Sequence, residues 1–169
     1  MKTHMAQTWK DEDISLDTIK DQTIAVIGYG IQGDAQANNM KDSGLKVIIG
    51  LKEGGASWQK AKDDGHEVFS VSDATKKADI IHILIPDMVQ AKVYKEEIAP
   101  YLSEGKALSF SHAAAIYWKW IDAPENVDLI MIAPKGPGSK VRETYLENFG
   151  TPSWYNVVSA FIVHLIPHS

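Results

Sequence analysis

The sequence contains no cysteine, which excludes disulfide bonds and thiolate metal sites. A chain without disulfides suits a reducing compartment, and we expect the cytoplasm. A long hydrophobic run is also lacking. The longest such run, residues 157–166, is interrupted by Ser159 and His164 and falls short of the roughly 20 residues that span a bilayer. The first 13 residues lack the apolar stretch of a signal peptide. We therefore expect no association with a membrane.

Positive charge is scarce as well. The chain has 17 Lys and Arg residues against 22 Asp and Glu residues, and its net charge is −5. No run of basic residues is present that could neutralise a phosphate backbone, so nucleic acid is not an expected partner. The 169 residues are 44% hydrophobic and 23% charged, which is typical of one compact domain with a core. Because no repeat or linker divides the chain, we predict a single domain over residues 1–169.

Apolar runs alternate with amphipathic segments along most of the sequence. The run 23–27 is continuously apolar, as in a parallel strand that is covered on both faces. Further strands are expected over residues 46–49, 67–69, 80–85, 107–110 and 129–132. Helices are expected up to about Asp42, over 57–63, from a cap at Ser72–Asp73 to Ala78, over 89–98 and over 140–147. This order predicts an α/β fold of the Rossmann type, with a doubly wound, mainly parallel sheet and right-handed crossovers.

A glycine motif follows the first predicted strand. It has the form Gly-x-Gly-x-x-Gly, begins directly after residue 27 and opens a predicted helix. In this context the first glycine makes the tight turn, the second lets a pyrophosphate approach, and the third lets the helix pack on the strand. The free amides of the helix start attract the anion. The simpler alternative is a structural glycine turn. The predicted dinucleotide-binding residues are Gly28, Tyr29, Gly30, Ile31, Gln32 and Gly33.

The choice of nucleotide depends on the loop after the second strand. NAD-specific sites usually carry an acid at the end of that strand, about 20 residues after the first glycine. Gly50 stands at this place, and Lys52 and Ser57 follow with a charge and a hydroxyl for a 2′-phosphate. Glu53 is an alternative acid for the ribose, and a merely solvated loop is the simplest alternative. We favour NADP(H) over NAD(H). Asp34, in the first helical turn, would repel a pyrophosphate unless its side chain points away.

Several further segments match a known family in unbroken order. Over about residues 8–152 the chain resembles the amino-terminal domain of ketol-acid reductoisomerase, whereas residues 153–169 diverge. The resemblance implies the same Rossmann fold. The matching segments are Asp11–Leu16, Ala25–Gly30, Gln32–Gly33, Asp42–Gly44, Val47–Leu51, Ser57–Trp58, Ala78–Ile80, Ile85–Gln90, Phe110–His112, Ile132–Gly138 and Val141–Arg142.

The resemblance also implies a function and a set of site residues. The family converts acetolactate or acetohydroxybutyrate into dihydroxy acids of valine and isoleucine synthesis, by a magnesium-dependent alkyl shift and hydride transfer from NADPH. His112 then corresponds to an active-site histidine and Lys135 to an active-site lysine, while Pro86 and Asp87 lie beside the nicotinamide. A histidine suits proton transfer, and a lysine stabilises a developing alkoxide. Without the resemblance, both would be interpreted as ordinary polar surface residues.

The sequence departs from the family at several points. Ile31 and Asp34 replace the usual motif residues, and Ala113–Tyr117 replaces a Gly-Phe-Asn-Ile-His segment after the histidine. The family's helical carboxy-terminal domain, which carries the magnesium carboxylates, has no counterpart. No histidine spacing suggests another metal site, so we name no metal ligand. We therefore expect the chain alone to be inactive for lack of the metal-binding domain.

Two alternative functions remain, and the tail bears on assembly. The chain could be a truncated, non-catalytic nucleotide-binding or assembly module, or a different NAD(P)-dependent reductase without magnesium. The tail segment 157–163 is expected to form a last, exposed strand. An uncovered strand edge favours association, so a homo-oligomer formed through this tail is a further prediction.

Overall fold

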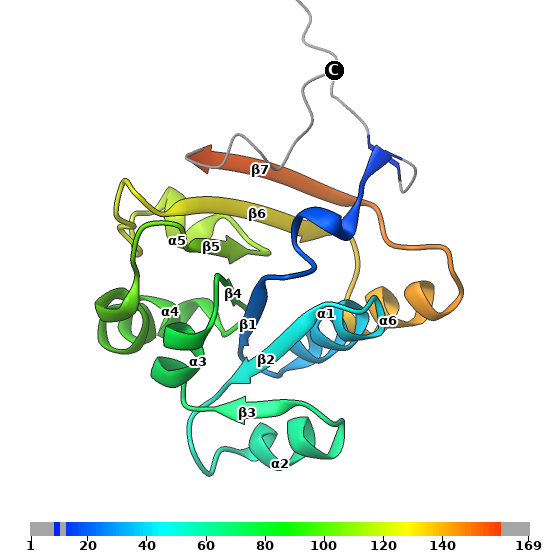
Figure 1. Ribbon diagram of the computed structural model, residues 1–169, viewed down its shortest axis with the longest axis horizontal. Helices are drawn as coiled ribbons and strands as arrows, with labels where there is room; N and C mark the ends of the chain where they lie inside the picture. Colours follow the sequence, from blue (N-terminus) through cyan, green and yellow to red (C-terminus); the bar gives the residue numbers. More distant parts are fainter. Residues whose placement is uncertain (1–8, 11–12, 160–169) are drawn as a thin grey trace, which may run out of the picture.

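The computed structural model describes residues 9–10 and 13–159, which form one seven-stranded sheet covered by helices (Figure 1). The strand order is β3-β2-β1-β4-β5-β6-β7, and only β7 is antiparallel to its neighbour. The predicted Rossmann topology is thereby confirmed. The strands are β1 (Thr23–Ile27), β2 (Lys46–Gly50), β3 (Glu67–Phe69), β4 (Ile80–Ile83), β5 (Ala107–Phe110), β6 (Asp128–Pro134) and β7 (Ser153–Ser159).

The helices cover both faces of this sheet. Helices α1 and α6 lie side by side, and α3 and α4 lie on the other side of β1 (Figure 1). Within residues 9–10 and 13–159, no helix is both long enough and apolar enough to cross a membrane. The helical segments are η2 (Leu16–Thr18), α1 (Ile31–Asp42), α2 (Ala56–Asp63), α3 (Val71–Lys77), α4 (Asp87–Val93), η3 (Tyr94–Ile98), η4 (Ala99–Tyr101), α5 (Ala114–Tyr117) and α6 (Gly138–Leu146).

The first strand shows why the sheet is covered on both faces. Ala25 and Ile27 pack in one buried cluster that includes residues of α3 and η3. Ile24 and Val26 pack in a second cluster with α1 and α2. Since successive side chains of a strand point to opposite faces, a continuous apolar run supplies both clusters. The run thus predicts the central place of β1 in the sheet.

Several predicted boundaries were wrong. Helix α3 begins at Val71 because the hydroxyl of Ser70, not that of Ser72, accepts a hydrogen bond from the amide of Asp73 at 3.1 Å. The predicted strand 80–85 already ends at Ile83. The predicted helix 89–98 begins two residues earlier, at Asp87, and widens into the π-helical segment η3. The chain turns early at Pro86, which precedes α4 as its N-cap.

The carboxy-terminal elements also differ from prediction. Strand β6 is longer than the predicted 129–132, and α6 covers Gly138–Leu146 instead of 140–147. The last strand begins at Ser153, not at Val157, because it pairs antiparallel with β6 from Leu129 to Pro134. Residues 160–163 of the predicted strand lie outside the described residues. Strand β7 stands at the edge of the sheet, and its Trp154 is 62% exposed.

Candidate nucleotide-binding and active site

The glycine turn joins the carboxyl end of β1 to the start of α1. Gly28 has a φ of +102°, and a Cβ there would lie 2.8 Å from the carbonyl oxygen of Leu84. A Cβ on Gly33 would lie 2.3 Å from the carbonyl oxygen of Gly28, so the helix packs directly on the turn. No atom lies within 4 Å of a Cβ on Gly30, which leaves that side open. The turn therefore has the shape that a pyrophosphate requires, with the free amides of α1 behind it.

The other residues of the motif differ in what they offer to a ligand. The side chain of Tyr29 is only 3% exposed, and its hydroxyl donates a hydrogen bond to Asp64 Oδ2 at 2.8 Å. Burial and this carboxylate raise the pKa of Tyr29, so its hydroxyl stays protonated. Only the backbone of Tyr29 is left for a nucleotide. Ile31 is 73% exposed at the start of α1. Gln32 lines the pocket that is described below, and its Nε2 donates a hydrogen bond to the carbonyl oxygen of Gly136 at 3.0 Å.

The carboxylate of Asp34 is engaged by two neighbouring side chains. One carboxylate oxygen forms an ion pair with Lys60 of α2, and the other accepts a hydrogen bond from Asn38 Nδ2 at 2.7 Å. The negative charge that would repel a pyrophosphate is thus held against a cation. The ion pair with Lys60 thus weakens the repulsion that Asp34 would exert on an anion at the helix start.

Gly50 lies where a NAD-specific acid would stand, but packing explains its identity. A Cβ there would lie 2.5 Å from Ile27 Cδ1 and 3.1 Å from the Cβ of Ala74. A carboxylate at this position would enter the apolar core between β1 and α3. Its absence therefore carries no information about the nucleotide, and that part of the argument for NADP(H) was wrong.

The other specificity residues lie after β2. Lys52 and Glu53 are exposed in a turn that is closed by a hydrogen bond from the amide of Gly55 to the carbonyl oxygen of Lys52 at 3.0 Å. Ser57 lies half-buried in the first turn of α2. Because β1 and β2 are parallel neighbours, this loop and the glycine turn follow the same edge of the sheet. Within the described part of the chain, the side chains of Lys52 and Ser57 form no hydrogen bond or ion pair, which leaves them available to a ligand.

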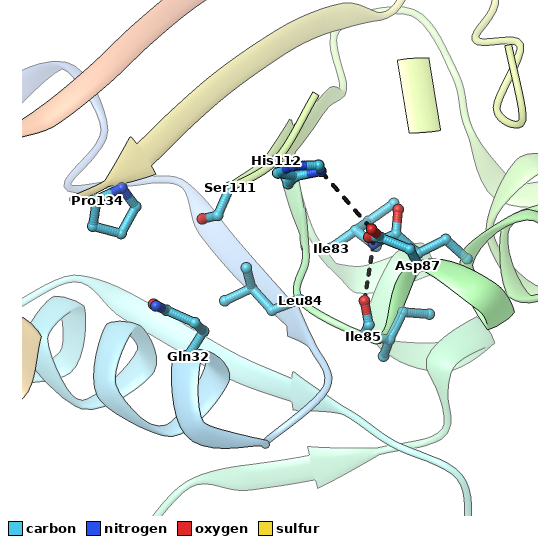
Figure 2. A pocket seen from close by; sticks show the side chains of 9 residues that line it. Gln32, Ile83, Leu84, Ile85, Asp87, Ser111, His112 and Pro134 are labelled. Atoms are coloured by element: carbon cyan, nitrogen blue, oxygen red, sulfur yellow. Dashed lines mark hydrogen bonds and ion pairs between the residues drawn. The ribbon is translucent and has the colours of Figure 1, made fainter. Parts of the chain in front are cut away.

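A pocket of about 200 Å³ lies at the carboxyl ends of β4, β5 and β6 (Figure 2). It brings three predicted site residues together: Gln32, Asp87 and His112. Pro86 is the N-cap of α4 and lies between two lining residues without lining the pocket itself. The lining residues are Gln32, Ile83, Leu84, Ile85, Asp87, Gln90, Ser111, His112 and Pro134.

His112 stands at the mouth of this pocket and is well exposed. Its Nδ1 accepts a hydrogen bond from the amide of Ala114 at 3.3 Å and lies 3.8 Å from Asp87 Oδ2 (Figure 2). Gln90 holds Asp87 in place, because its Nε2 donates to Asp87 Oδ1 at 3.1 Å and to the carbonyl oxygen of Ile85 at 2.9 Å. With Nδ1 accepting, the uncharged ring carries its hydrogen on Nε2.

Lys135 is not brought into the pocket. It follows the lining residue Pro134, and its Nζ lies 5.3 Å from the centre of the Trp154 ring on β7. A cation over an aromatic ring is stabilised there by electrostatics, so Trp154 holds the ammonium at the strand edge. The catalytic role of Lys135 stays a prediction.

Sequence reasoning missed the polar residues beneath the pocket. Ser111 and Gln90 line it, and His82 and Ser109 lie buried below it on β4 and β5. The signal for His82 was a single imidazole inside an otherwise apolar strand. Such a group needs hydrogen-bond partners, and neither partner is near it in sequence.

No metal centre can be built from the described part of the chain. Among residues 9–10 and 13–159, no group of three or more His, Cys, Asp or Glu side chains could hold a metal ion. The donor set that magnesium requires is therefore not offered by these residues, and no chemical step is assigned to a metal here.

The doubly wound sheet, the glycine turn after its first strand and the pocket at the carboxyl ends of its strands define a dinucleotide-binding domain of the Rossmann class. Residues 18–161 match the family model described as acetohydroxy acid isomeroreductase, NADPH-binding domain. The chain belongs to this family.

Close relatives agree with this assignment. The chain is 86% identical over 149 residues to a ketol-acid reductoisomerase (NADP(+)) of Nitrosopumilus maritimus, which covers 88% of this chain and 45% of that protein. It is 57% identical, with the same coverage, to the enzyme of that name from Pyrococcus abyssi. The chain thus spans about 45% of the length of these curated relatives.

Solved structures support the fold. A structure described as an NADH-preferring ketol-acid reductoisomerase from an uncultured archean has a TM-score of 0.89 and 48% identity, and covers 92% of this chain and 49% of that one. A semialdehyde dehydrogenase NAD-binding protein from Cupriavidus necator has a TM-score of 0.61 at 24% identity, covering 68% of this chain and 42% of that one. The second likeness shows the shared fold alone.

Proposed function

We propose that this domain binds NADPH, with the pyrophosphate on the turn Gly28–Gly33 and the nicotinamide end in the pocket beside His112. One observation carries the proposal: Gln32 belongs to the glycine motif and also lines the pocket, so the two parts of the site are contiguous. The open side of Gly30 receives the phosphates. The matched family model bears the description NADPH-binding domain.

The preference for NADP(H) rests on Lys52 and Ser57, which lie in the loop that follows β2 and are available to a 2′-phosphate. The names of the curated relatives contain NADP(+), which supports the same choice. Glu53 in the same turn would favour the ribose hydroxyls of NAD(H), and one similar structure is described as NADH-preferring. Binding of NAD(H) with lower affinity is therefore part of the proposal.

The activity of the relatives suggests the reaction in which this domain takes part. We propose that it contributes to the reduction of an acetohydroxy acid in branched-chain amino acid synthesis in the cytoplasm. His112 would exchange a proton with the substrate, and Lys135 would stabilise its oxygen after leaving Trp154. Since the described residues offer no group of metal ligands, no part of the family's magnesium-dependent alkyl shift is assigned to them.

Association of two copies through the exposed edge strand β7 is the corresponding proposal for assembly. Trp154 and Tyr155 are both exposed on this strand, and an edge of this kind pairs readily with another chain. The expected result is a dimer in sedimentation at micromolar concentration. A charge placed on the strand by Val157→Lys should dissociate it, and a monomeric parent chain would overturn this part of the proposal.

The proposal as a whole is tested by titrating NADPH and NADH into the chain with calorimetry. Gly30→Ala should weaken the binding of both nucleotides without loss of stability, because its Cβ meets open space. Gly33→Ala should lower stability, because its Cβ meets a carbonyl oxygen. Ser57→Asp should weaken NADPH more than NADH by repelling the 2′-phosphate, with Ser57→Ala as the control. Absence of binding to either nucleotide by the parent chain would refute the proposal.

A further inference from the structure

A chain of buried polar side chains lies beneath the pocket, between the sheet and α1. His82 on β4 and Ser109 on β5 are neighbours in the parallel register, and each is 5% exposed. His82 Nδ1 lies 2.9 Å from Ser109 Oγ, and His82 Nε2 lies 2.8 Å from Gln36 Oε1 on α1. Both ring nitrogens are therefore partnered, by residues of two different elements.

The chain of hydrogen bonds continues from Gln36 to the pocket. Gln36 Nε2 donates to Gln32 Oε1 at 2.9 Å and to Ser111 Oγ at 3.1 Å. Gln32 Nε2 in turn donates to the carbonyl oxygen of Gly136 at 3.0 Å. Gln32 and Ser111 both line the pocket, and Gly136 follows Lys135 in the β6–α6 loop. The network thus joins the ends of β1, β5 and β6, which are the three segments that carry the site.

The directions of the bonds from Gly136 to His82 follow from one another, whereas the Ser111 hydroxyl can accept from Gln36 Nε2 at 3.1 Å or donate to Gln36 Oε1 at 3.4 Å. A carbonyl oxygen only accepts, so the Gly136 carbonyl fixes the orientation of the Gln32 amide, and Gln32 Oε1 fixes that of Gln36. Gln36 Oε1 then requires the proton of His82 to lie on Nε2, and Ser109 donates to Nδ1. Burial lowers the pKa of His82 to about 4, which keeps the ring neutral at physiological pH.

We propose that Gln36 and His82 are positioning residues for the nicotinamide end of the nucleotide, acting through Gln32 and Ser111 on the pocket and through Gly136 on the loop of Lys135. The close approach of α6 to α1 supports a need for accurate placement, since a Cβ on Gly138 would lie 2.1 Å from the carbonyl oxygen of Ile31. The ligand in this inference rests on the proposed function, whereas the network and its effect on the pocket do not.

Two substitutions at Gln36 separate positioning from mere stability. Gln36→Glu keeps an acceptor for His82 Nε2 and for the Ser111 hydroxyl, but it cannot donate to Gln32 Oε1, so it breaks the link from Gln36 to Gln32. Gln36→Met removes the amide without adding charge. Ser109→Ala is the matched control, because it breaks one hydrogen bond of His82 on the side away from the pocket.

The first measurement compares two ligands on the full chain. NADPH reaches the pocket, whereas adenosine 2′,5′-bisphosphate lacks the nicotinamide end. Both Gln36 variants should weaken the affinity for NADPH by roughly tenfold, the loss expected when one or two hydrogen bonds no longer hold the pocket. The affinity for adenosine 2′,5′-bisphosphate should change by less than about twofold. Ser109→Ala should change neither affinity. Unchanged NADPH binding in both Gln36 variants, or a parallel loss of both ligands, overturns the inference.

The second measurement needs no ligand. In nuclear magnetic resonance spectra, the His82 ring should carry its proton on Nε2 in the parent chain and in Gln36→Glu. The amide signals of Ser111, His112 and Gly136 should shift in both Gln36 variants but not in Ser109→Ala. If the parent chain binds neither ligand, the proposed function fails, and these shifts alone decide the inference. Unmoved signals in the Gln36 variants overturn it.

Discussion

Helix α1 has a buried histidine on each of its flanks, and the two differ in how they are held. His82 contacts Gln36 and has both ring nitrogens partnered, with no charged side chain in its network. His66, 7% exposed, contacts Asn38 through Nε2 at 3.1 Å, while its Nδ1 has no hydrogen-bond partner among the described residues. The first flank faces the pocket, and the second faces α2 and β3.

The surroundings of the two rings explain the difference. Burial lowers the pKa of His66, and Lys41 lowers it further, whereas Asp64 and Asp34 act in the opposite direction. For His82 burial is the main cause, and an interaction with the backbone of Ser109 opposes it only in part. Neutral groups with fixed donors and acceptors define one geometry. Charged groups at a partly exposed flank tolerate several geometries. The uncharged network, in which both ring nitrogens are partnered, therefore lies on the flank that faces the pocket.

The largest expected effect is the dependence of stability on pH through His82. Its pKa is 6.5 in the unfolded chain and about 4 in the folded one. The free energy of unfolding therefore has its full value, as far as His82 is concerned, above pH 6.5. It decreases as the pH falls from 6.5 to about 4, in total by about 3 kcal/mol, because only the unfolded chain binds the proton readily. Urea unfolding of the parent chain and of His82→Gln between about pH 7 and pH 4 measures it. If the free energy of unfolding depended on pH equally in the parent chain and in His82→Gln, this prediction would be contradicted.

A smaller effect is expected on the charged flank. Tyr29→Phe removes the hydrogen bond to Asp64 and the one received from Asn38 at 2.9 Å, which should cost about 1 kcal/mol because Asp64 regains water. The control is Tyr145→Phe, because the Tyr145 hydroxyl contacts Ser43 at an exposed position and should contribute almost nothing. Urea unfolding at neutral pH measures the free energy of unfolding of the two variants. NADPH affinity should stay unchanged, since the Tyr29 ring lies in the core, and a large loss would show that this flank also shapes the site.

The smallest expected effect concerns Lys60, which forms the ion pair with Asp34. Lys60→Met should cost less than about 1 kcal/mol of stability, because the two side chains are 52% and 33% exposed. It should still weaken NADPH a few-fold by leaving Asp34 uncompensated near the phosphates, and about 1 M salt should abolish this difference. Asp34→Asn together with Lys60→Met should restore the affinity. An effect of Lys60→Met that persists in salt would mean that Lys60 touches the nucleotide.

Local patterns were the reliable part of the sequence. The apolar run 23–27 and the glycine motif after it predicted β1, the turn and the start of α1 at the right residues. The limits of α3 and α4 were less accessible, because Ser70 and Ser72 are equally good caps in sequence and only the backbone selects one. The interpretation of Gly50 failed for a related reason. The direction of its missing Cβ, toward Ile27, follows from the pairing of β2 with β1 and from the packing of α3.

The sequence by itself determined the order of strands and helices, the dinucleotide motif and the family resemblance, because these depend on residues that are close together in the chain. Tertiary structure alone decided which polar side chains meet. His82 and Gln36 are 46 residues apart and Gln36 and Ser111 are 75 apart, and they come into contact because β1, β4 and β5 are neighbours under α1. It also decided that Asp34 faces Lys60 and that Lys135 rests on Trp154. Hydrogen bonds and ion pairs form only at short range, and folding brings these distant residues within that range.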